Sequence, residues 1–336
     1  MKLLRQLLFP VVPIYFLITW LRNKAFDFGV LYSKSYDFPI ICVGNLSAGG
    51  TGKSPMVGYL ISILKEDFNT ATLSRGYGRA TKGFVLAEKE NTYKDLGDES
   101  FQYYENFGDN ITVAVCEDRQ NGIEQLRQLA PKPELIILDD AFQHRKVKAG
   151  LNILLTTYSN LFTDDMVLPS GNLREPKSGY KRAQLIVVTK CPESISDADK
   201  KQVIAKIKPQ SHQHIYFSSI KYSETVHAFN SKTKLSSLNT FTLVTGIANS
   251  KPLVDFLKSN QLEFRHLEYK DHHNFTDKDI EALSKLDQIL TTEKDYMRLK
   301  NFEVLKDKLY YLPITVSIDL EGHFDAEVKR FVTANL

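Results

Sequence analysis

Short apolar runs alternate with longer amphipathic stretches along most of this chain. Each run has the length of a buried strand, and continuous hydrophobicity is typical of strands that are covered on both faces. The stretches between the runs, such as 54–65 and 196–208, carry helical patterns. This order predicts an α/β fold in which a mostly parallel sheet is flanked by helices. The predicted strands occupy residues 38–45, 111–116, 133–140, 151–157 and 183–190, together with the start of NTATLSRGYGR and the segment HIYFSS.

The pattern changes around residues 218–237, where the chain becomes polar and loses its apolar periodicity. We interpret this segment as a passage between two domains. Beyond it, FTLVTGI, QILTT and YYLPITVSI predict strands, while SKPLVDFLKSN and TDKDIEALSKL predict helices. We therefore expect a large domain over residues 25–220 and a smaller α/β domain over residues 221–336.

The first 24 residues have a different character. No charged residue lies between Gln6 and Leu21, most side chains there are apolar, and Arg5 and Arg22 bracket the stretch. It is short of the roughly 20 residues that span a bilayer comfortably, and its aromatic and cationic flanks suit a membrane interface. We predict a membrane-associated helix over residues 1–24, which either spans the bilayer or lies on it. The alternative is a helix that simply packs on the large domain.

The composition narrows the classes of function. With 336 residues and 43% apolar side chains, the chain can build two compact cores. A net charge of only +3 argues for no nucleic-acid partner. Cys42, Cys116 and Cys191 fit no metal-ligand spacing, so we expect reduced thiols in a cytoplasmic environment.

The strongest chemical signal is the segment VGNLSAGGTGKSP, residues 43–55. A strand ends here, and a glycine-rich loop leads into a helix, so that backbone N–H groups converge on phosphate oxygens. In such a P-loop, Lys53 neutralises the β- and γ-phosphates of ATP, and the Ser54 hydroxyl binds Mg²⁺. Ser47 stands where the strict motif has glycine. We predict Lys53 as catalytic, and the ATP- and phosphate-binding residues as Ser47, Ala48, Gly49, Gly50, Thr51, Gly52, Lys53 and Ser54.

Two pairs of acidic residues are candidates for metal binding and catalysis. An apolar strand that ends in Asp139 and Asp140 has the form of a Walker B motif, so Asp139 is the predicted Mg²⁺ ligand and Asp140 faces substrate or a second ion. Asp98 and Glu99 open a predicted helix. They serve either as helix caps or as a base and a Mg²⁺ ligand near the γ-phosphate.

The segment DHHNF contains the adjacent histidines His272 and His273. One of them could carry a proton or orient a carboxylate, and the alternative is that both are ordinary surface residues. Arginines in glycine-containing loops could bind phosphate oxygens, although such residues are often only solvated. The candidate contacts to substrate or phosphate are Arg75, Arg79, Asp140, Gln143 and Arg174.

The segment VVTK, residues 187–190, invites comparison with the guanine-reading motif of GTPases. Cys191 and Pro192 follow the lysine, so the carboxylate that accepts the guanine amino proton is missing. This favours ATP over GTP as the nucleotide.

Taken together, these segments resemble the tetraacyldisaccharide 4′-kinase family, the lipid A 4′-kinases of Gram-negative bacteria. The matching motifs extend over almost the whole chain and include VGNLSAGGTGKSP, LSRGYGR, GDES, LDDAFQH, LPSGNLREP, VTGIANSKPL, DHHNFT and TTEKD. In that family serine or threonine is common at the position of Ser47. Ala141 is a departure, because the family usually has glycine there.

The resemblance implies phosphoryl transfer from ATP to the 4′-hydroxyl of a tetraacyl glucosamine disaccharide 1-phosphate, a lipid A precursor. It implies that Asp98 is the catalytic carboxylate, paired with His272 or, one position along, with His273. It also implies that Ser54, Glu99 and Asp139 manage Mg²⁺. The smaller domain would close over the nucleotide and exclude water.

The resemblance also gives the N-terminal helix a purpose. A lipid with four acyl chains leaves the bilayer at great cost, since each buried CH₂ contributes about 0.8 kcal/mol. The enzyme is therefore expected at the cytoplasmic face of the inner membrane, held peripherally or by a single N-terminal anchor, with no obligate protein partner evident. The alternative class is a P-loop GTPase or ATPase switch, or a metal chaperone, which would hydrolyse nucleotide without phosphorylating a lipid.

Overall fold

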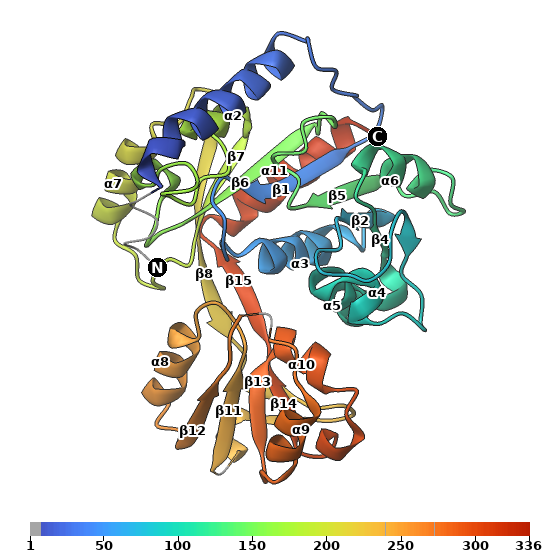
Figure 1. The fold of residues 1–336 in the computed structure, drawn as a ribbon, viewed down its shortest axis with the longest axis vertical. Coiled ribbons are helices and arrows are strands. Elements are labelled where there is room, and N and C mark those ends of the chain that lie inside the picture. Colours follow the sequence, from blue (N-terminus) through green and yellow to red (C-terminus); the bar gives the residue numbers. More distant parts are fainter. Residues whose placement is uncertain (1–7, 239, 272) are drawn as a thin grey trace.

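The computed structural model describes residues 8–238, 240–271 and 273–336. In this part of the chain, one sheet has nine strands in the order β15-β8-β7-β6-β1-β5-β2-β4-β3 (Figure 1). The strands are β1 (Ile40–Asn45), β2 (Thr70–Ser74), β3 (Val85–Leu86), β4 (Thr112–Val115), β5 (Leu135–Asp139), β6 (Leu151–Thr157), β7 (Leu185–Thr189), β8 (His214–Tyr222) and β15 (Ile314–Ile318). Strands β8, β7, β6, β1, β5, β2 and β4 pair in parallel, and only the outermost strands β15 and β3 pair antiparallel. The sequence prediction of a mostly parallel sheet is confirmed.

Helices cover both faces of this first sheet. Along β1, Ile41 and Val43 pack with α3, α5 and α11 on one face. Ile40 and Cys42, which alternate with them, pack with α6 and α7 on the other face. The helices are α3 (Lys53–Leu64), α4 (Tyr93–Leu96), α5 (Asp98–Phe107), α6 (Arg119–Leu126), α7 (Asp197–Ile207) and α11 (Glu321–Ala334). Short 3₁₀ segments lie at Gly108–Asn110, Phe162–Asp164 and Lys177–Arg182.

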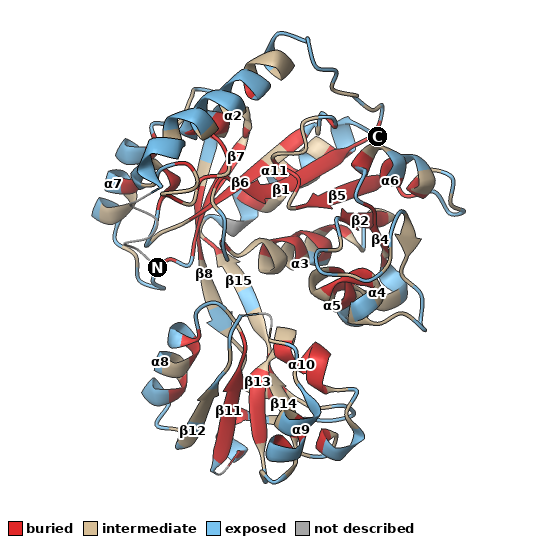
Figure 2. Ribbon diagram, viewed as in Figure 1, coloured by how far each residue is buried: buried red, intermediate tan, exposed pale blue. Residues whose placement is uncertain are grey.

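A second sheet lies below the first in Figure 1. Its strands follow the order β10-β9-β14-β13-β11-β12 in the described residues. They are β9 (Thr225–His227), β10 (Lys232–Lys234), β11 (Phe241–Thr245), β12 (Phe264–Glu268), β13 (Ile289–Thr292) and β14 (Leu309–Leu312). The accompanying helices are α8 (Lys251–Ser259), α9 (Asp277–Ser284) and α10 (Glu293–Leu299), with 3₁₀ segments at Leu235–Ser237 and Glu303–Leu305. The buried strands of both sheets contrast with their exposed loops in Figure 2.

Two segments differ from the sequence prediction. The passage expected over residues 218–237 is wrong as a loop, because β8 continues to Tyr222 and β9 and β10 follow. The run YYLPITVSI is not one strand. Pro313 divides it into β14, in the second sheet, and β15, which pairs antiparallel with β8 in the first. Strand β15 and helix α11 therefore return the chain to the large sheet, so the second sheet does not coincide with residues 221–336.

The N-terminal segment forms a short 3₁₀ turn (Phe9–Val11) and helix α2 (Val12–Asp27). One side of α2 faces the protein: Val12 and Tyr15 pack against the core of the first sheet, and Asn23 is buried. The other side is largely exposed (Figure 2). Within the described residues, no helix combines the length and apolarity needed to cross a membrane. A helix is therefore present, but it covers residues 12–27 and not 1–24, and residues 1–7 of the predicted range lie outside the described residues. Packing of this helix on the domain, which was the alternative, is observed.

Candidate active site

The P-loop connects β1 to α3, as the motif predicts. Gly49 and Gly52 have positive φ angles of 124° and 87°, which glycine adopts without the strain of a side chain. Gly52 is also the N-cap residue of α3. Lys53 and Ser54 therefore open the helix, where its partial positive charge favours phosphate.

Neighbouring segments hold the P-loop in place. The Asn45 side chain donates to the Ser47 carbonyl over 2.7 Å and contacts the Thr51 hydroxyl over 2.8 Å. From β7, the Thr189 hydroxyl donates to the Thr51 carbonyl, and Lys190 Nζ donates to the Gly50 carbonyl over 2.6 Å. The VVTK segment, which the sequence separated from a guanine-reading motif, thus supports the loop. Its position at the end of a predicted strand was the available signal, and in the sheet β6 lies between β7 and β1.

Lys53, Asp140 and Arg174 form a charged group beside the P-loop. The Lys53 amine lies 3.7 Å from Oδ1 of Asp140, and Arg174 Nη1 contacts both carboxylate oxygens of Asp140 at 3.0 and 3.1 Å. Asp140 has a positive φ of 47°, which turns the chain directly after β5. The structure therefore brings the P-loop lysine together with two of the predicted contact residues. The carboxylate of Asp140 thus lies between the positive charges of Lys53 and Arg174.

Asp139 differs from its neighbour because it is buried. The Tyr103 hydroxyl donates to Oδ2 of Asp139 over 3.1 Å and also interacts with Ser54. Oδ1 has no hydrogen-bond partner among the described residues. Burial, reinforced by the charges of Asp140 and Glu99, raises the pKa of Asp139 to about 7. An ionised carboxylate here is short of positive charge, which is what a divalent cation would supply.

The donor set fits Mg²⁺ better than a metal held by protein alone. Within the described ranges, no group of three or more His, Cys, Asp or Glu side chains is arranged to hold a metal ion. Mg²⁺ commonly uses one or two carboxylates and completes its shell with phosphate oxygens and water. Asp139, with its unpartnered oxygen, and Ser54, linked to it through Tyr103, are placed for this role. The electrostatic influence of Glu99 on Asp139 puts a second carboxylate in the same region.

Asp98 and Glu99 begin α5 and face helix α10 of the second sheet. Arg298 on α10 binds Asp98 with two nitrogen atoms, and the Nε–Oδ1 distance is 3.1 Å. The two side chains are only 5% and 12% exposed. Lys294, also on α10, lies 3.9 Å from Glu99. The capping role considered for Asp98 is not supported, because Gly97 is the N-cap residue and shows no side-chain cap. Sequence reasoning missed Arg298, although it closes the TTEKDYMR segment that contains the family-like TTEKD motif.

The two histidines of the DHHNF segment have different outcomes. His272 lies outside the described residues, so its predicted pairing with Asp98 stays a prediction. The His273 ring contacts Oδ2 of Asp279 at 3.0 Å and stacks on Tyr269 with 4.7 Å between ring centroids. Asp279 belongs to the capping box of α9. His273 is thus engaged in the second unit, and its backbone carbonyl accepts a hydrogen bond from Arg298 over 3.2 Å.

The remaining candidate contacts lie in two places. Arg75 is exposed at the end of β2. Arg79 instead pairs with Glu117 at 2.6 Å and donates to the Gly83 carbonyl, which closes its own glycine-rich loop.

The buried Arg119, not singled out from the sequence, donates to the Asp139 carbonyl over 3.2 Å. The aspartate at its helix N-cap was the only local signal.

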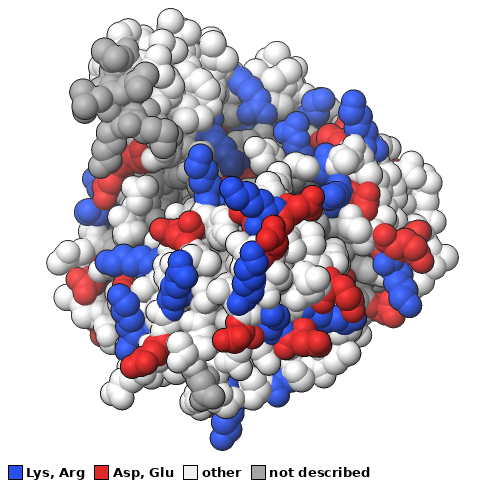
Figure 3. All heavy atoms as spheres, turned by 60° about the horizontal axis from the view of Figure 1, so that its bottom comes forward, with Lys and Arg blue, Asp and Glu red and all other residues white. Residues whose placement is uncertain are grey.

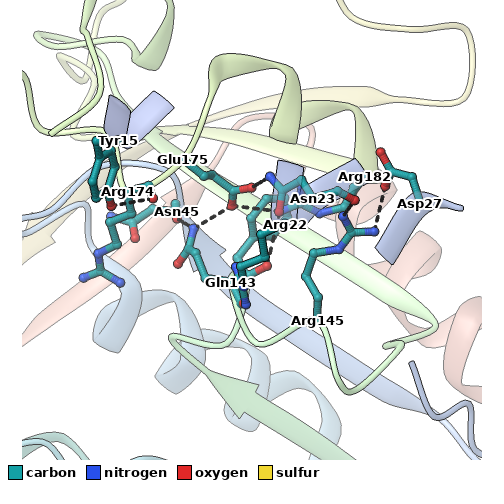
Figure 4. Close-up of polar contacts among 11 residues, drawn as sticks. Tyr15, Arg22, Asn23, Asp27, Asn45, Gln143, Arg145, Arg174, Glu175 and Arg182 are labelled. Carbon is teal, nitrogen blue, oxygen red and sulfur yellow. Dashed lines mark hydrogen bonds and ion pairs between the residues drawn. The ribbon is translucent and has the colours of Figure 1, made fainter. Parts of the chain in front are cut away.

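Gln143 and the buried Glu175 connect the P-loop to α2 (Figure 4). Gln143 Nε2 donates to the Asn45 carbonyl over 2.8 Å and to Glu175 over 3.0 Å. Glu175 also accepts hydrogen bonds from Arg182 and from Asn23 of α2, at 2.8 and 2.6 Å. One chain of hydrogen bonds therefore joins the N-terminal helix to the strand end that carries the P-loop. Glu175 was missed because a lone glutamate in LREP carries no chemical pattern.

Charged side chains of both signs lie on the surface of the molecule. On the face shown in Figure 3, cationic and anionic side chains are interspersed over the surface. Cationic side chains also gather at a hollow in that face (Figure 3). A local group of cations can attract a small anionic ligand.

Comparisons with known proteins point in one direction. The family model described as "Tetraacyldisaccharide-1-P 4'-kinase" matches residues 4–333. Proteins named tetraacyldisaccharide 4′-kinase include one from Flavobacterium johnsoniae, 45% identical over 100% of this chain and 99% of its own length. Another, from Bacteroides fragilis, is 44% identical over 98% of this chain and 93% of its own length.

A solved structure agrees with the sequence relatives. The protein LpxK from Aquifex aeolicus, solved in complex with ATP, is 28% identical to this chain. The match has a TM-score of 0.78 and covers 98% of this chain and 99% of that one. The similarity thus extends over both sheets and the N-terminal helix.

Proposed function

Because the chain belongs to the tetraacyldisaccharide 4′-kinase family, we propose that it phosphorylates the 4′-hydroxyl of a tetraacyl glucosamine disaccharide 1-phosphate, using ATP, in lipid A biosynthesis. The observation that carries the proposal is the placement of Lys53. It opens α3 at the end of a glycine loop, beside Asp140 and Arg174. A switch protein or metal chaperone shares the loop but does not account for the family match over residues 4–333.

On binding, the triphosphate of ATP would replace Asp140 as the ion-pair partner of Lys53. The ion pairs of Asp140 with Lys53 and Arg174 keep both cations close to the phosphate site. The triphosphate carries more negative charge than one carboxylate, so it competes with Asp140 for Lys53. Lys53 and the P-loop amides then stabilise the charge that moves onto the β–γ bridging oxygen as that bond breaks.

The acceptor hydroxyl needs a group that receives its proton. Asp98 begins α5, and Arg298 orients both of its carboxylate oxygens. As the bond from the hydroxyl oxygen to phosphorus forms, the hydroxyl proton passes to Asp98, and the phosphoryl group leaves ADP. His272 is the partner that the family resemblance assigns to Asp98.

Asp139, Ser54 and Glu99 would hold Mg²⁺ at this site. When bound, the ion supplies positive charge that neutralises the β- and γ-phosphate oxygens. Oδ1 of Asp139, which has no hydrogen-bond partner in the described part of the chain, supports this assignment. Arg119 and Tyr103 fix the position of the strand end and carboxylate from the protein side.

The lipid substrate places the enzyme at a membrane surface, and we propose the cytoplasmic face of the inner membrane, where ATP is present. Helix α2 lies between that surface and the P-loop network. An apolar groove of about 380 Å³ runs beside α2 and is lined by residues that include Phe16, Trp20, Met166 and Leu173. Such a groove can accept part of an acyl chain. The glucosamine headgroup would then approach Asp98 from the membrane side.

The decisive experiment measures the product directly. Purified full-length protein is incubated with ATP, Mg²⁺ and the tetraacyl disaccharide 1-phosphate in detergent micelles, and the lipid is analysed by mass spectrometry. We expect addition of one phosphoryl group, and none with Lys53→Ala. Hydrolysis of ATP without phosphorylated lipid would contradict the proposal and favour the switch class.

A further inference from the structure

The segment that follows α2 presents an unusual group of apolar side chains. Phe28 and Val30 are each 78% exposed, and Tyr32 is 75% exposed. Leu31 between them is also exposed. Single exposed apolar residues are ordinary on a protein surface, but several in one short turn indicate a surface that binds something apolar.

Hydrogen bonds fix the backbone of this turn at both ends. At its start, the N–H of Gly29 donates to the Phe26 carbonyl over 3.2 Å, and the N–H of Leu31 donates to the Ala25 carbonyl over 2.9 Å. At its end, the Ser33 hydroxyl donates to the Arg145 carbonyl, and the Lys34 backbone pairs with the segment after β5. The apolar side chains are therefore held outward by an ordered backbone.

The turn continues the exposed side of α2. Ile14, Leu21 and Phe28 are spaced by seven residues, and all three are exposed. Seven residues correspond to nearly two helical turns, so these side chains share one side of the helix. Val12 and Tyr15 pack the opposite side onto the core. In Figure 1, α2 and the segment after it run along the same upper edge of the molecule.

Cations accompany the aromatic side chains of this surface. Lys24 Nζ lies 5.7 Å from the centroid of the Phe28 ring, and the Arg22 guanidinium lies 5.4 Å from that of Phe26. Lys24 also pairs with Asp27 at 3.6 Å. Long basic side chains can keep their charge in the headgroup layer while neighbouring rings enter the acyl region. This combination favours an anionic bilayer as the partner over another protein.

We propose that the turn Phe28–Tyr32 is a second membrane-docking element, which inserts into an anionic bilayer surface next to the exposed side of α2. The choice of a lipid partner rests on the proposed function. Two attachment points, α2 and the turn, fix the orientation of the first sheet on the membrane, whereas one helix alone leaves rotation about its axis free. The P-loop network of Figure 4 then stands at a set distance from the lipid headgroups.

A binding experiment tests the turn. The full chain is mixed with vesicles of phosphatidylcholine and phosphatidylglycerol, and the bound fraction is measured by flotation. The variant Phe28→Ser/Val30→Ser should lower the partition coefficient by at least about tenfold. The matched control is Phe229→Ser, since Phe229 is also exposed beneath a lysine, Lys306 at 4.5 Å, but belongs to the second unit. Binding of the double variant within twofold of the unmodified chain overturns the proposal.

A gain of signal provides a second, independent measurement. The chain has one tryptophan, Trp20, so Trp20→Phe gives a background without tryptophan fluorescence. In this background Val30→Trp should be quenched by vesicles that contain brominated lipids, and Val304→Trp on the second unit should not. Val304 is a fair control because it too is exposed. Equal quenching of both, or quenching of neither, refutes insertion of the turn.

Other occupants and the proposed function give distinguishable results. If a second copy of the chain covers the turn, Phe28→Ser/Val30→Ser will abolish a dimer in sedimentation and leave vesicle binding intact, which contradicts the proposal. Kinase activity in detergent micelles should be unchanged by the double variant, because no residue of the active site is altered. Failure of that activity in the unmodified protein would refute the proposed function while the vesicle assay still decides the role of the turn.

Discussion

The ion pair between Arg298 and Asp98 joins the two sheets at the candidate active site, so its removal should reduce both stability and catalysis. Arg298 lies on α10 and Asp98 opens α5, 200 residues apart in the sequence. Both side chains are largely buried, and two guanidinium nitrogens bind the carboxylate. Removing one partner of such a pair costs about 3–5 kcal/mol, because the remaining charge stays in a poorly solvated place. We expect Arg298→Met to lose about 3 kcal/mol of unfolding free energy.

An exposed ion pair serves as the control for the loss of unfolding free energy. Glu281 on α9 and Lys285, the C-cap residue of that helix, are 2.8 Å apart at i, i+4 spacing, with both side chains mostly exposed. Pairs of this kind contribute about 0.3–0.5 kcal/mol, so Lys285→Met should have little effect. Urea unfolding followed by circular dichroism compares the two variants. If Arg298→Met is no more destabilising than Lys285→Met, the pair does not tie the two sheets together.

Catalysis distinguishes orientation of Asp98 from simple stability. In the lipid assay Arg298→Met should lower kcat far more than it raises the KM for ATP, because Arg298 does not belong to the phosphate site. Arg298→Lys keeps the charge but loses the two-nitrogen contact, so we expect partial recovery of kcat. An unchanged kcat in a folded Arg298→Met protein would contradict the positioning of Asp98 by this arginine.

Three further outcomes are expected. Lys53→Ala should lower kcat by about three to four powers of ten, because a positive charge that binds the phosphates is lost, and the control Lys278→Ala, on the exposed side of α9, should leave kcat unchanged. A Lys53→Ala enzyme with activity within threefold of the unmodified enzyme would refute the P-loop assignment. Asp98→Ala and His272→Ala should each lower kcat by about 10²–10⁴-fold, and the double variant should lose much less than the product of the two single losses, since residues that act as one unit are non-additive. A loss in the double variant equal to that product would show that the two residues act separately. Burial lowers the pKa of His144 from its ordinary 6.5 to about 4, so the unfolded chain binds a proton more readily than the folded one, and stability should fall as pH drops from 6.5 to 4. His144→Gln should flatten that slope, and parallel slopes of the two proteins in urea unfolding would contradict the shift.

The sequence predicted the local elements well where one apolar pattern coincided with one element. Strand β1, the glycine loop and helix α3 follow directly from residues 38–65, because a buried run, glycines and an amphipathic stretch each favour one backbone state. The same reasoning failed at YYLPITVSI. Periodicity reports that a segment is buried, but not which sheet buries it, and the proline was the only sign of the change of sheet.

By itself, then, the sequence determined the α/β class, the phosphate-binding loop and the resemblance to a family, since these depend on residues that are close together along the chain. Only the tertiary structure decided which distant groups meet. It placed Arg298 on Asp98, left one oxygen of Asp139 without a hydrogen-bond partner among the described residues, and linked α2 to the P-loop through Gln143 and Glu175. Contacts of this kind depend on the order of strands and on the packing of helices across them. The pattern of polar and apolar residues along the chain predicts which segments are buried, but it does not identify the segments that pack against them.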